Sequence, residues 1–106
     1  MVTAVYEITK TFPTDERFGL MSQIRRAGVS VPANIAEGAA RQRGKEFCHF
    51  LSIAQGSASE LETELLIAKN LGYLSSADYD RIHEQINVIA RMIVGPAKTI
   101  RSRTGN

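Results

Sequence analysis

The sequence has few of the residues that mark secreted, disulfide-linked or membrane-embedded proteins. It contains one cysteine and no tryptophan in 106 residues, and a single cysteine excludes an internal disulfide framework. It also lacks an apolar run of about 18 residues and a signal-peptide pattern, which argues against a membrane span and against secretion. We therefore expect a cytoplasmic protein with no membrane role.

A strong excess of one charge is absent as well. The formal net charge is +2, from 13 Lys and Arg and 11 Asp and Glu. Composition alone therefore does not indicate a nucleic-acid-binding protein. The charge is unevenly distributed, because the segment after position 80 holds five basic residues and one glutamate. With 43% hydrophobic residues, residues 1–106 are expected to form a single globular domain.

What the chain does have is apolar residues at helical spacing throughout. The pattern predicts helices over residues 2–11, about 14–41, 46–71 and from 76 onward, the last continuing past Gly95-Pro96 with a kink. Gly72 is expected to cap the third helix and Ser75 to begin the fourth. The most regular seam consists of Phe47, Leu51, Ala54, Ala58, Leu61, Leu65 and Ala68. This pattern predicts an all-α, up-and-down four-helix bundle.

The second predicted helix contains two glycines, a proline and an asparagine where an ordinary helix has alanine or leucine. Close approach of another backbone would compensate for the glycines. Pro32 lacks a backbone donor, so we expect the helix to be kinked or to restart near Ser30, with Ser30 as the cap. Asn34 and Glu37 are predicted to hydrogen-bond across helices and to fix the bend. The alternative is a ligand pocket at the bend.

A series of polar, glycine and apolar motifs runs in order from residue 12 to residue 74. These motifs are Phe12-Pro13, Glu16-Arg17-Phe18-Gly19-Leu20, Gln23-Ile24-Arg25-Arg26-Ala27, Ser30-Val31-Pro32-Ala33-Asn34-Ile35-Ala36-Glu37-Gly38, Glu46-Phe47, Phe50-Leu51, Ile53-Ala54, Gly56-Ser57, Glu60-Leu61 and Leu71-Gly72-Tyr73-Leu74. Together they resemble the four-helix bundle proteins of the 23S ribosomal RNA intervening-sequence family. The first helix departs from the family, whose members usually have a longer one that carries a tryptophan, and we expect it to be shortened here.

The resemblance implies a ring of five subunits without enzymatic activity. The chain is similar as well to accessory subunits of diversity-generating retroelements, which are basic pentameric barrels that bind a reverse transcriptase and nucleic acid. The residues independently favour an oligomer. Two of the predicted helices have apolar faces that are wider than one packing seam, and small residues form a stripe on the second and third helices. Together these surfaces exceed what a small monomer needs for its own core. The alternative is that all of this surface is internal core.

The candidate nucleic-acid-binding residues are Arg25, Arg26, Arg41, Arg43, Lys45, Lys98, Arg101 and Arg103. Ring symmetry would repeat these charges and focus the potential on one face, so that binding is sequence-tolerant and sensitive to salt. The alternative for Arg25 and Arg26 is pairing with a glutamate at 60, 62 or 64, and for Arg41 it is pairing with a glutamate one turn earlier. That structural role is favoured for these three residues. No aromatic residue interleaves the candidates, so a base-stacking platform is not expected.

Two helical motifs suggest a metal-dependent enzyme as a distant alternative. Glu46-x-x-His49 and Asp80-x-x-His83 have the spacing of di-metal bundle proteins. His49 falls outside the apolar seam, however, and aspartate is a poor replacement for glutamate. Cys48 has no second cysteine at ligand spacing and is expected to be a half-buried thiol. We therefore expect no catalytic residue, metal or cofactor.

These observations predict a non-enzymatic homo-oligomeric scaffold, with five subunits as the number that the resemblance implies. Its expected partner is RNA, DNA or a protein that handles nucleic acid. The main alternative is a module for protein–protein interaction alone, with no role in nucleic-acid binding.

Overall fold

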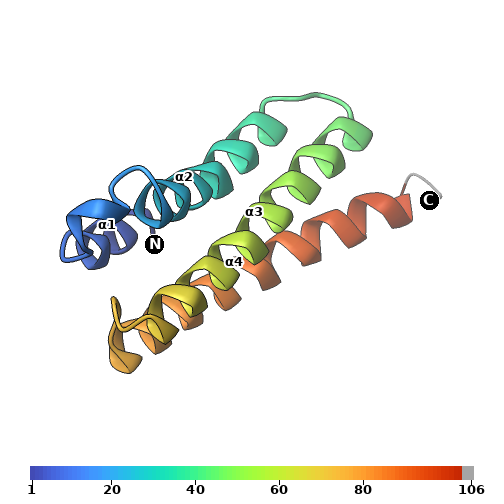
Figure 1. The fold of residues 1–106 in the computed structure, drawn as a ribbon. Helices are drawn as coiled ribbons and strands as arrows, with labels where there is room; N and C mark the ends of the chain where they lie inside the picture. Colours follow the sequence, from blue (N-terminus) through green and yellow to red (C-terminus); the bar gives the residue numbers. More distant parts are fainter. Residues whose placement is uncertain (104–106) are drawn as a thin grey trace.

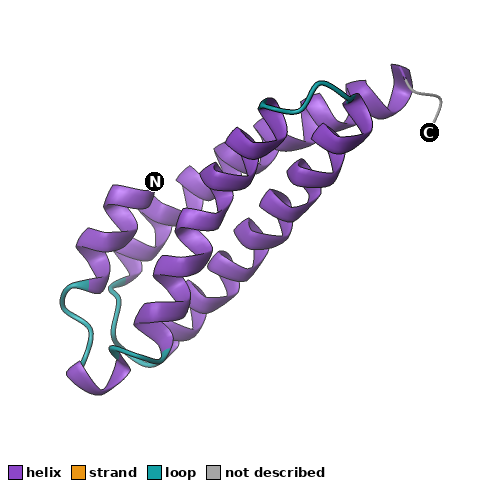
Figure 2. Ribbon diagram, turned by 90° about the horizontal axis from the view of Figure 1, so that it is seen from above, coloured by secondary structure: helices purple, strands orange, loops and turns teal. Residues whose placement is uncertain are grey.

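The computed structural model describes the backbone of residues 1–103 and the side chains of residues 1–93. Within that range the chain forms α1 (Val2–Thr9), a short 3₁₀ helix η1 (Thr14–Glu16), α2 (Leu20–Ala39), α3 (Gly44–Asn70) and α4 (Ser76–Arg103), and no strand (Figure 1). Each α-helix packs against the next one in the chain, and α1 also contacts α4 (Figure 2). The predicted all-α four-helix bundle is confirmed, and α1 is its shortest α-helix, at 8 residues.

The core consists of the apolar stripes that the helical spacing predicts. From α3 it takes the predicted seam, with Phe47 half-buried and the other six residues buried, and the other helices contribute Val5, Ile8, Ile24, Val31, Ile82, Ile86 and Ile93. None of the described helices is both long and apolar enough to cross a membrane. Burial of these stripes against one another is the main stabilising term of such a bundle.

The second helix differs from the prediction in the middle. α2 runs without a break from Leu20 to Ala39 with Pro32 inside it, so the predicted restart near Ser30 is wrong and Ser30 is not a cap. Pro32 removes one backbone hydrogen bond, but Val31 beside it is buried in the core. The helix continues because packing on α3 outweighs the lost bond.

The polar residues Ser30, Asn34 and Glu37 of this segment have other hydrogen-bond partners than those predicted. Ser30 Oγ lies 2.7 Å from Ser57 Oγ on α3, and Asn34 Nδ2 donates to Ser30 O at 2.8 Å and to Ser30 Oγ at 2.9 Å. Ser30 therefore makes the contact across helices, and the prediction for Asn34 is wrong, because both hydrogen bonds of Asn34 Nδ2 go to Ser30 on its own helix. The prediction for Glu37 is wrong, because its exposed carboxylate pairs with Arg41, which lies just beyond the end of α2.

The start of α2 lies six residues later than predicted, because Thr14 opens η1 and the α-helix begins at Leu20. Gly19 before it has a non-helical backbone, with φ −107° and ψ −115°. Glu16 Oε1 accepts a hydrogen bond from Leu20 N at 3.2 Å, and Glu16 Oε2 accepts one from Tyr73 Oη at 3.0 Å. One carboxylate thus caps α2 and ties it to the turn between α3 and α4.

The turn between α3 and α4 has the predicted caps. Gly72 has φ +80°, and the backbone N–H groups of Tyr73 and Gly72 donate to Ala68 O and Lys69 O at 2.9 and 3.0 Å, the bonds of a Schellman motif. Ser75 Oγ accepts from Asp78 N at 3.1 Å. The expected continuation of the last helix is also confirmed, since α4 passes through Pro96 to Arg103.

Two glycines on packed helices have opposite surroundings. A Cβ atom at Gly38 would lie 3.0 Å from Phe47 Cδ1 and 3.0 Å from Phe50 Cβ, whereas a Cβ at Gly56 would meet nothing within 4 Å. The close approach of α2 and α3 that the glycines suggested therefore occurs at Gly38.

These surroundings predict opposite effects of the same substitution. Gly38→Ala should lower the free energy of unfolding by about 1–3 kcal/mol, because α3 must shift to admit the methyl group. Gly56→Ala should raise it by about 0.5–1 kcal/mol through helix propensity. Urea denaturation of both variants measures the difference. Equal effects would show that the α2–α3 contact has room for the methyl group.

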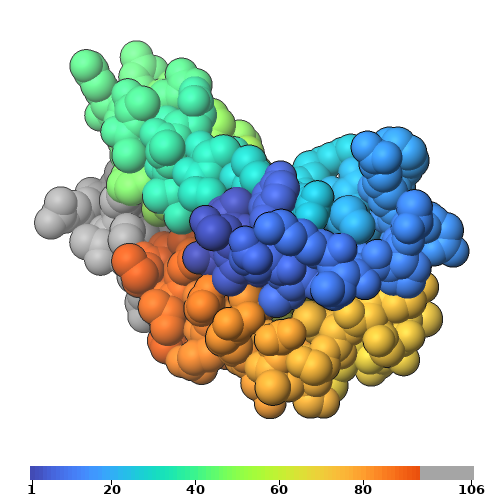
Figure 3. All heavy atoms as spheres, turned by 90° about the vertical axis from the view of Figure 1, so that its left-hand side faces the viewer, coloured from blue at the N-terminus to red at the C-terminus, as the bar shows by residue number. Residues whose placement is uncertain are grey.

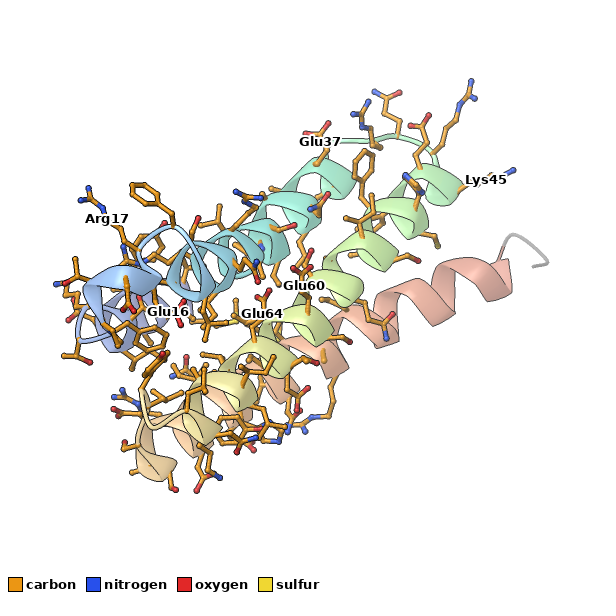
Figure 4. All side chains as sticks on the ribbon, viewed as in Figure 1. Glu16, Arg17, Glu37, Lys45, Glu60 and Glu64 are labelled. Atoms are coloured by element: carbon orange, nitrogen blue, oxygen red, sulfur yellow. The ribbon has the colours of Figure 1, made fainter. Side chains whose placement is uncertain are left out.

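A buried carboxylate lies on the side of α3 that faces α2. Glu64 is 7% exposed and its Oε1 has no hydrogen-bond partner, and Glu60 lies one turn before it in the same space (Figure 4). Burial, together with the charge of Glu60 and a hydrogen bond with it, raises the pKa of Glu64 to about 7. The fold therefore favours the protonated form of Glu64.

Stability should consequently depend on pH through this residue. Because the folded pKa lies above the ordinary value of 4.5, the contribution is fully favourable below pH 4.5 and is lost as the pH rises toward 7. Glu64→Gln should raise the urea midpoint at pH 8 and leave it nearly unchanged at pH 4.5. Glu84→Gln, which removes the same charge from the surface of α4, is the control. A gain for Glu64→Gln of equal size at both pH values would contradict the assignment.

Candidate nucleic-acid interface

An open hollow of about 650 Å³ lies between α1, η1 and the first half of α2, at the end of the molecule that Figure 3 views. We call it the basic groove, and its lining residues are Tyr6, Lys10, Phe12, Thr14, Arg17, Phe18, Met21, Ser22, Arg25 and Arg26. Four of them are cationic and none is a carboxylate. A concave surface lined by one sign of charge concentrates the electrostatic potential.

Arg25 forms a fixed wall of the basic groove. Its Nε donates to Thr9 Oγ1 at 2.9 Å, and its guanidinium carbon lies 4.6 Å from the centre of the Tyr6 ring. Thr9 is fully buried and its hydroxyl also donates to Val5 O at 2.9 Å. The structural role expected for Arg25 is therefore confirmed, but its partners lie on α1, and the predicted pairing with a glutamate of α3 is wrong.

The other three cations project from the rim. Arg17 lies over the ring of Phe18, with 5.4 Å between the guanidinium carbon and the ring centre. Arg26 is exposed. Lys10 Nζ is 3.3 Å from Glu7 Oε1, with both side chains more than 60% exposed, and a pair of this kind contributes little. These cations are accessible to an anion from solution.

Aromatic rings lie among these cations, contrary to the prediction. Phe18 is 89% exposed and Tyr6 is 39% exposed, and each carries an arginine over its face. The residues that the sequence reasoning missed are Lys10, Arg17 and these two rings. The adjacent pair Arg17-Phe18 was the available signal, whereas Tyr6 reaches Arg25 only through the packing of α1 on α2.

A second basic group lies at the opposite end of α2. Arg41, Arg43 and Lys45 are all exposed, and Figure 4 places Lys45 at the other end of the molecule from Arg17. Because α2 has 20 residues, about 30 Å separates its two ends. Arg41 pairs with Glu37, as the structural alternative predicted, and its guanidinium carbon lies 5.0 Å from the centre of the Phe50 ring.

The last three candidates, Lys98, Arg101 and Arg103, have side chains outside the described residues. The backbone of α4 that carries them ends at the same end of the bundle as the α2–α3 connection (Figures 1 and 2). The eight predicted residues therefore divide between two ends of the molecule.

An apolar groove of about 390 Å³ lies beside the proline segment of α2. Its lining residues are Met1, Val2, Val31, Pro32, Ile35, Phe47, Leu51, Ile89, Met92 and Ile93. The ligand pocket that the sequence offered as an alternative at the bend thus corresponds to this groove, but Ser30, Asn34 and Glu37 do not line it.

The histidines do not form a metal centre. His49 packs edge-on against Phe50, and His83 stacks on Tyr79 with its Nδ1 2.7 Å from Glu62 Oε1. Burial, followed by the charges of Glu62 and Asp80, raises the pKa of Tyr79. Among the described residues, no three His, Cys, Asp or Glu side chains are placed to hold a metal ion. Cys48 is half-buried, as predicted.

Comparison with known proteins identifies the relatives of this fold. A solved structure of a protein of unknown function from the S23 ribosomal protein family of Bacteroides thetaiotaomicron matches with a TM-score of 0.80 and 26% identity, covering 92% of this chain and 88% of that one. No curated protein matches. The family model for the 23S rRNA-intervening sequence protein matches residues 1–95. The chain therefore belongs to the 23S rRNA-intervening sequence protein family.

Proposed function

We propose that the protein is a non-enzymatic, homo-oligomeric scaffold that binds RNA or another nucleic acid, or a protein that handles nucleic acid, through its basic surface. The observation that carries this proposal is the basic groove, in which four cations surround an open hollow with no carboxylate in its lining. Phosphate groups are the ligand that such a surface attracts most strongly, since cations that neutralise phosphates release condensed counterions.

Support for self-assembly comes from apolar surface that a single copy leaves uncovered. Ile53, Ile67 and Leu71 flank the buried seam of α3 and are 39%, 45% and 54% exposed. The small residues Ser52 and Ser59 of α3 are exposed as well, so another helix could approach closely. In this proposal a second copy covers these surfaces, with five copies as the expected number.

An oligomer would also strengthen binding to a polyanion. Each copy would contribute one basic groove, and linked weak sites on one strand bind far more tightly than a single site. The second candidate function is a protein-interaction module alone, which the same exposed apolar side chains favour. A comparison of assembly with polynucleotide binding separates the two functions.

Light scattering of the purified protein and an RNA titration test the proposal together. The expected results are a mass of several subunits and an affinity for a generic oligoribonucleotide that falls steeply between about 50 and 200 mM salt. The double variant Arg17→Gln/Arg26→Gln should weaken binding at least about tenfold. For each groove that the strand occupies, it should also make the slope of log K against log salt concentration shallower by about 1.4, or about 0.7 per phosphate contact.

The matched control for this titration is Arg81→Gln/Arg91→Gln. It changes the net charge by the same amount, at exposed positions of α4 that pair with Asp78 and Glu84, and it should bind almost as the original protein does. An assembly with no affinity for RNA would favour the protein-interaction module. Equal losses in both double variants would contradict the groove as the binding surface.

A further inference from the structure

We infer that the basic groove binds single-stranded nucleic acid, with one base stacked on Phe18 and the neighbouring phosphates held by Arg17 and Arg26. This inference rests on the proposed function and goes further by naming the kind of strand and the stacking residue. It begins from the 89% exposure of Phe18, which leaves an aromatic face accessible at the rim of a cationic hollow.

The backbone beneath Phe18 is well anchored. Arg17 N and Gly19 N donate to Thr14 O and Glu16 O, both at 3.1 Å. The Glu16 carboxylate accepts from Leu20 N and from Tyr73 Oη. Hydrogen bonds on both sides of Phe18 therefore hold its position, which limits the ordering cost when a flat ligand stacks on the ring.

The four cationic side chains of the basic groove differ in how freely they can bind a phosphate. Arg25 is held by Thr9 and Tyr6, whereas Lys10 makes only an exposed surface pair with Glu7. Arg17 and Arg26 are exposed on the same groove, and Arg17 already lies over the Phe18 ring. A nucleotide has a flat base and an anionic phosphate close together, and this pairing matches an exposed ring flanked by arginines.

The same chemistry favours a single strand over a duplex. Bases in a duplex are stacked on each other and present only their edges, whereas an unpaired strand can place a base on a protein ring. An acidic peptide would satisfy the arginines but would leave the exposed ring without a flat partner. Stacking is therefore the property that separates these ligands.

The absence of tryptophan from the chain provides a direct probe of stacking. Phe18→Trp introduces one fluorophore at the proposed platform, and Met92→Trp introduces one at a 66% exposed position of α4. A single-stranded oligouridylate should quench the first variant in a saturable manner and leave the second nearly unchanged. Inorganic polyphosphate should compete for the groove without quenching, and uridine monophosphate should require a far higher concentration than the oligomer.

Affinity measurements with substitutions at Phe18 test the energetic role of the ring. Phe18→Ala and Phe18→Leu should weaken binding of the single strand about fivefold to a hundredfold, while Phe18→Tyr stays close to the original protein. Binding of polyphosphate and of a duplex of the same length should change less than about twofold. Because Phe18 is exposed, these variants should keep the original melting temperature.

Several outcomes would overturn the inference. Strong RNA binding without quenching, and without loss in Phe18→Ala, would contradict stacking while leaving the proposed function intact. Saturation by the mononucleotide at the concentration of the oligomer would identify a free nucleotide as the ligand, and a changed mass for Phe18→Ala would place the ring between subunits. Absence of any RNA binding by the original protein would contradict the inference and the nucleic-acid part of the proposed function together.

Discussion

The close packing of α2 on α3 is the contact on which the rest of the structure depends. It is the most extensive pair among the described helices, and at Gly38 a methyl group would lie 3.0 Å from side-chain atoms of Phe47 and Phe50. The serine pair Ser30 and Ser57 joins the same two helices through their hydroxyl groups. Because these contacts lie on both sides of Pro32, they hold α2 as one helix and compensate for the backbone bond that the proline removes.

The unbroken α2 determines where the basic groove can form. The first half of α2 carries Arg25 and Arg26 and packs against α1, which supplies Tyr6 and Lys10 to the same hollow. The Glu16 carboxylate then fixes η1 by capping α2 and by accepting from Tyr73. That bond raises the pKa of Tyr73, since ionisation of the hydroxyl would remove its proton from the carboxylate. The groove is thus built from segments that are distant in the sequence.

Local patterns predicted the elements well and the polar contacts only partly. The seven-residue seam of α3, the positive φ of Gly72 and the cap at Ser75 follow from spacing and residue type, and each is present. The continuity of α2 through Pro32 depends on burial against α3, which local chemistry does not reveal. Arg25 likewise had acidic candidates on the next long helix, but its partners Thr9 and Tyr6 become neighbours only when α1 folds back. Charge alone could not identify the aromatic component of the groove.

The two proposed activities place opposite demands on the surface. Exposed apolar side chains on α3 gain stability only when another chain covers them, whereas the basic groove can bind a polyanion only while it stays open. These features lie on different parts of the molecule, since the groove belongs to α1, η1 and the start of α2, and the exposed apolar stripe belongs to α3. A ring built through α3 could therefore leave every groove accessible. Assembly would then repeat the charge without neutralising it, which is the condition under which a strand binds several weak sites at once.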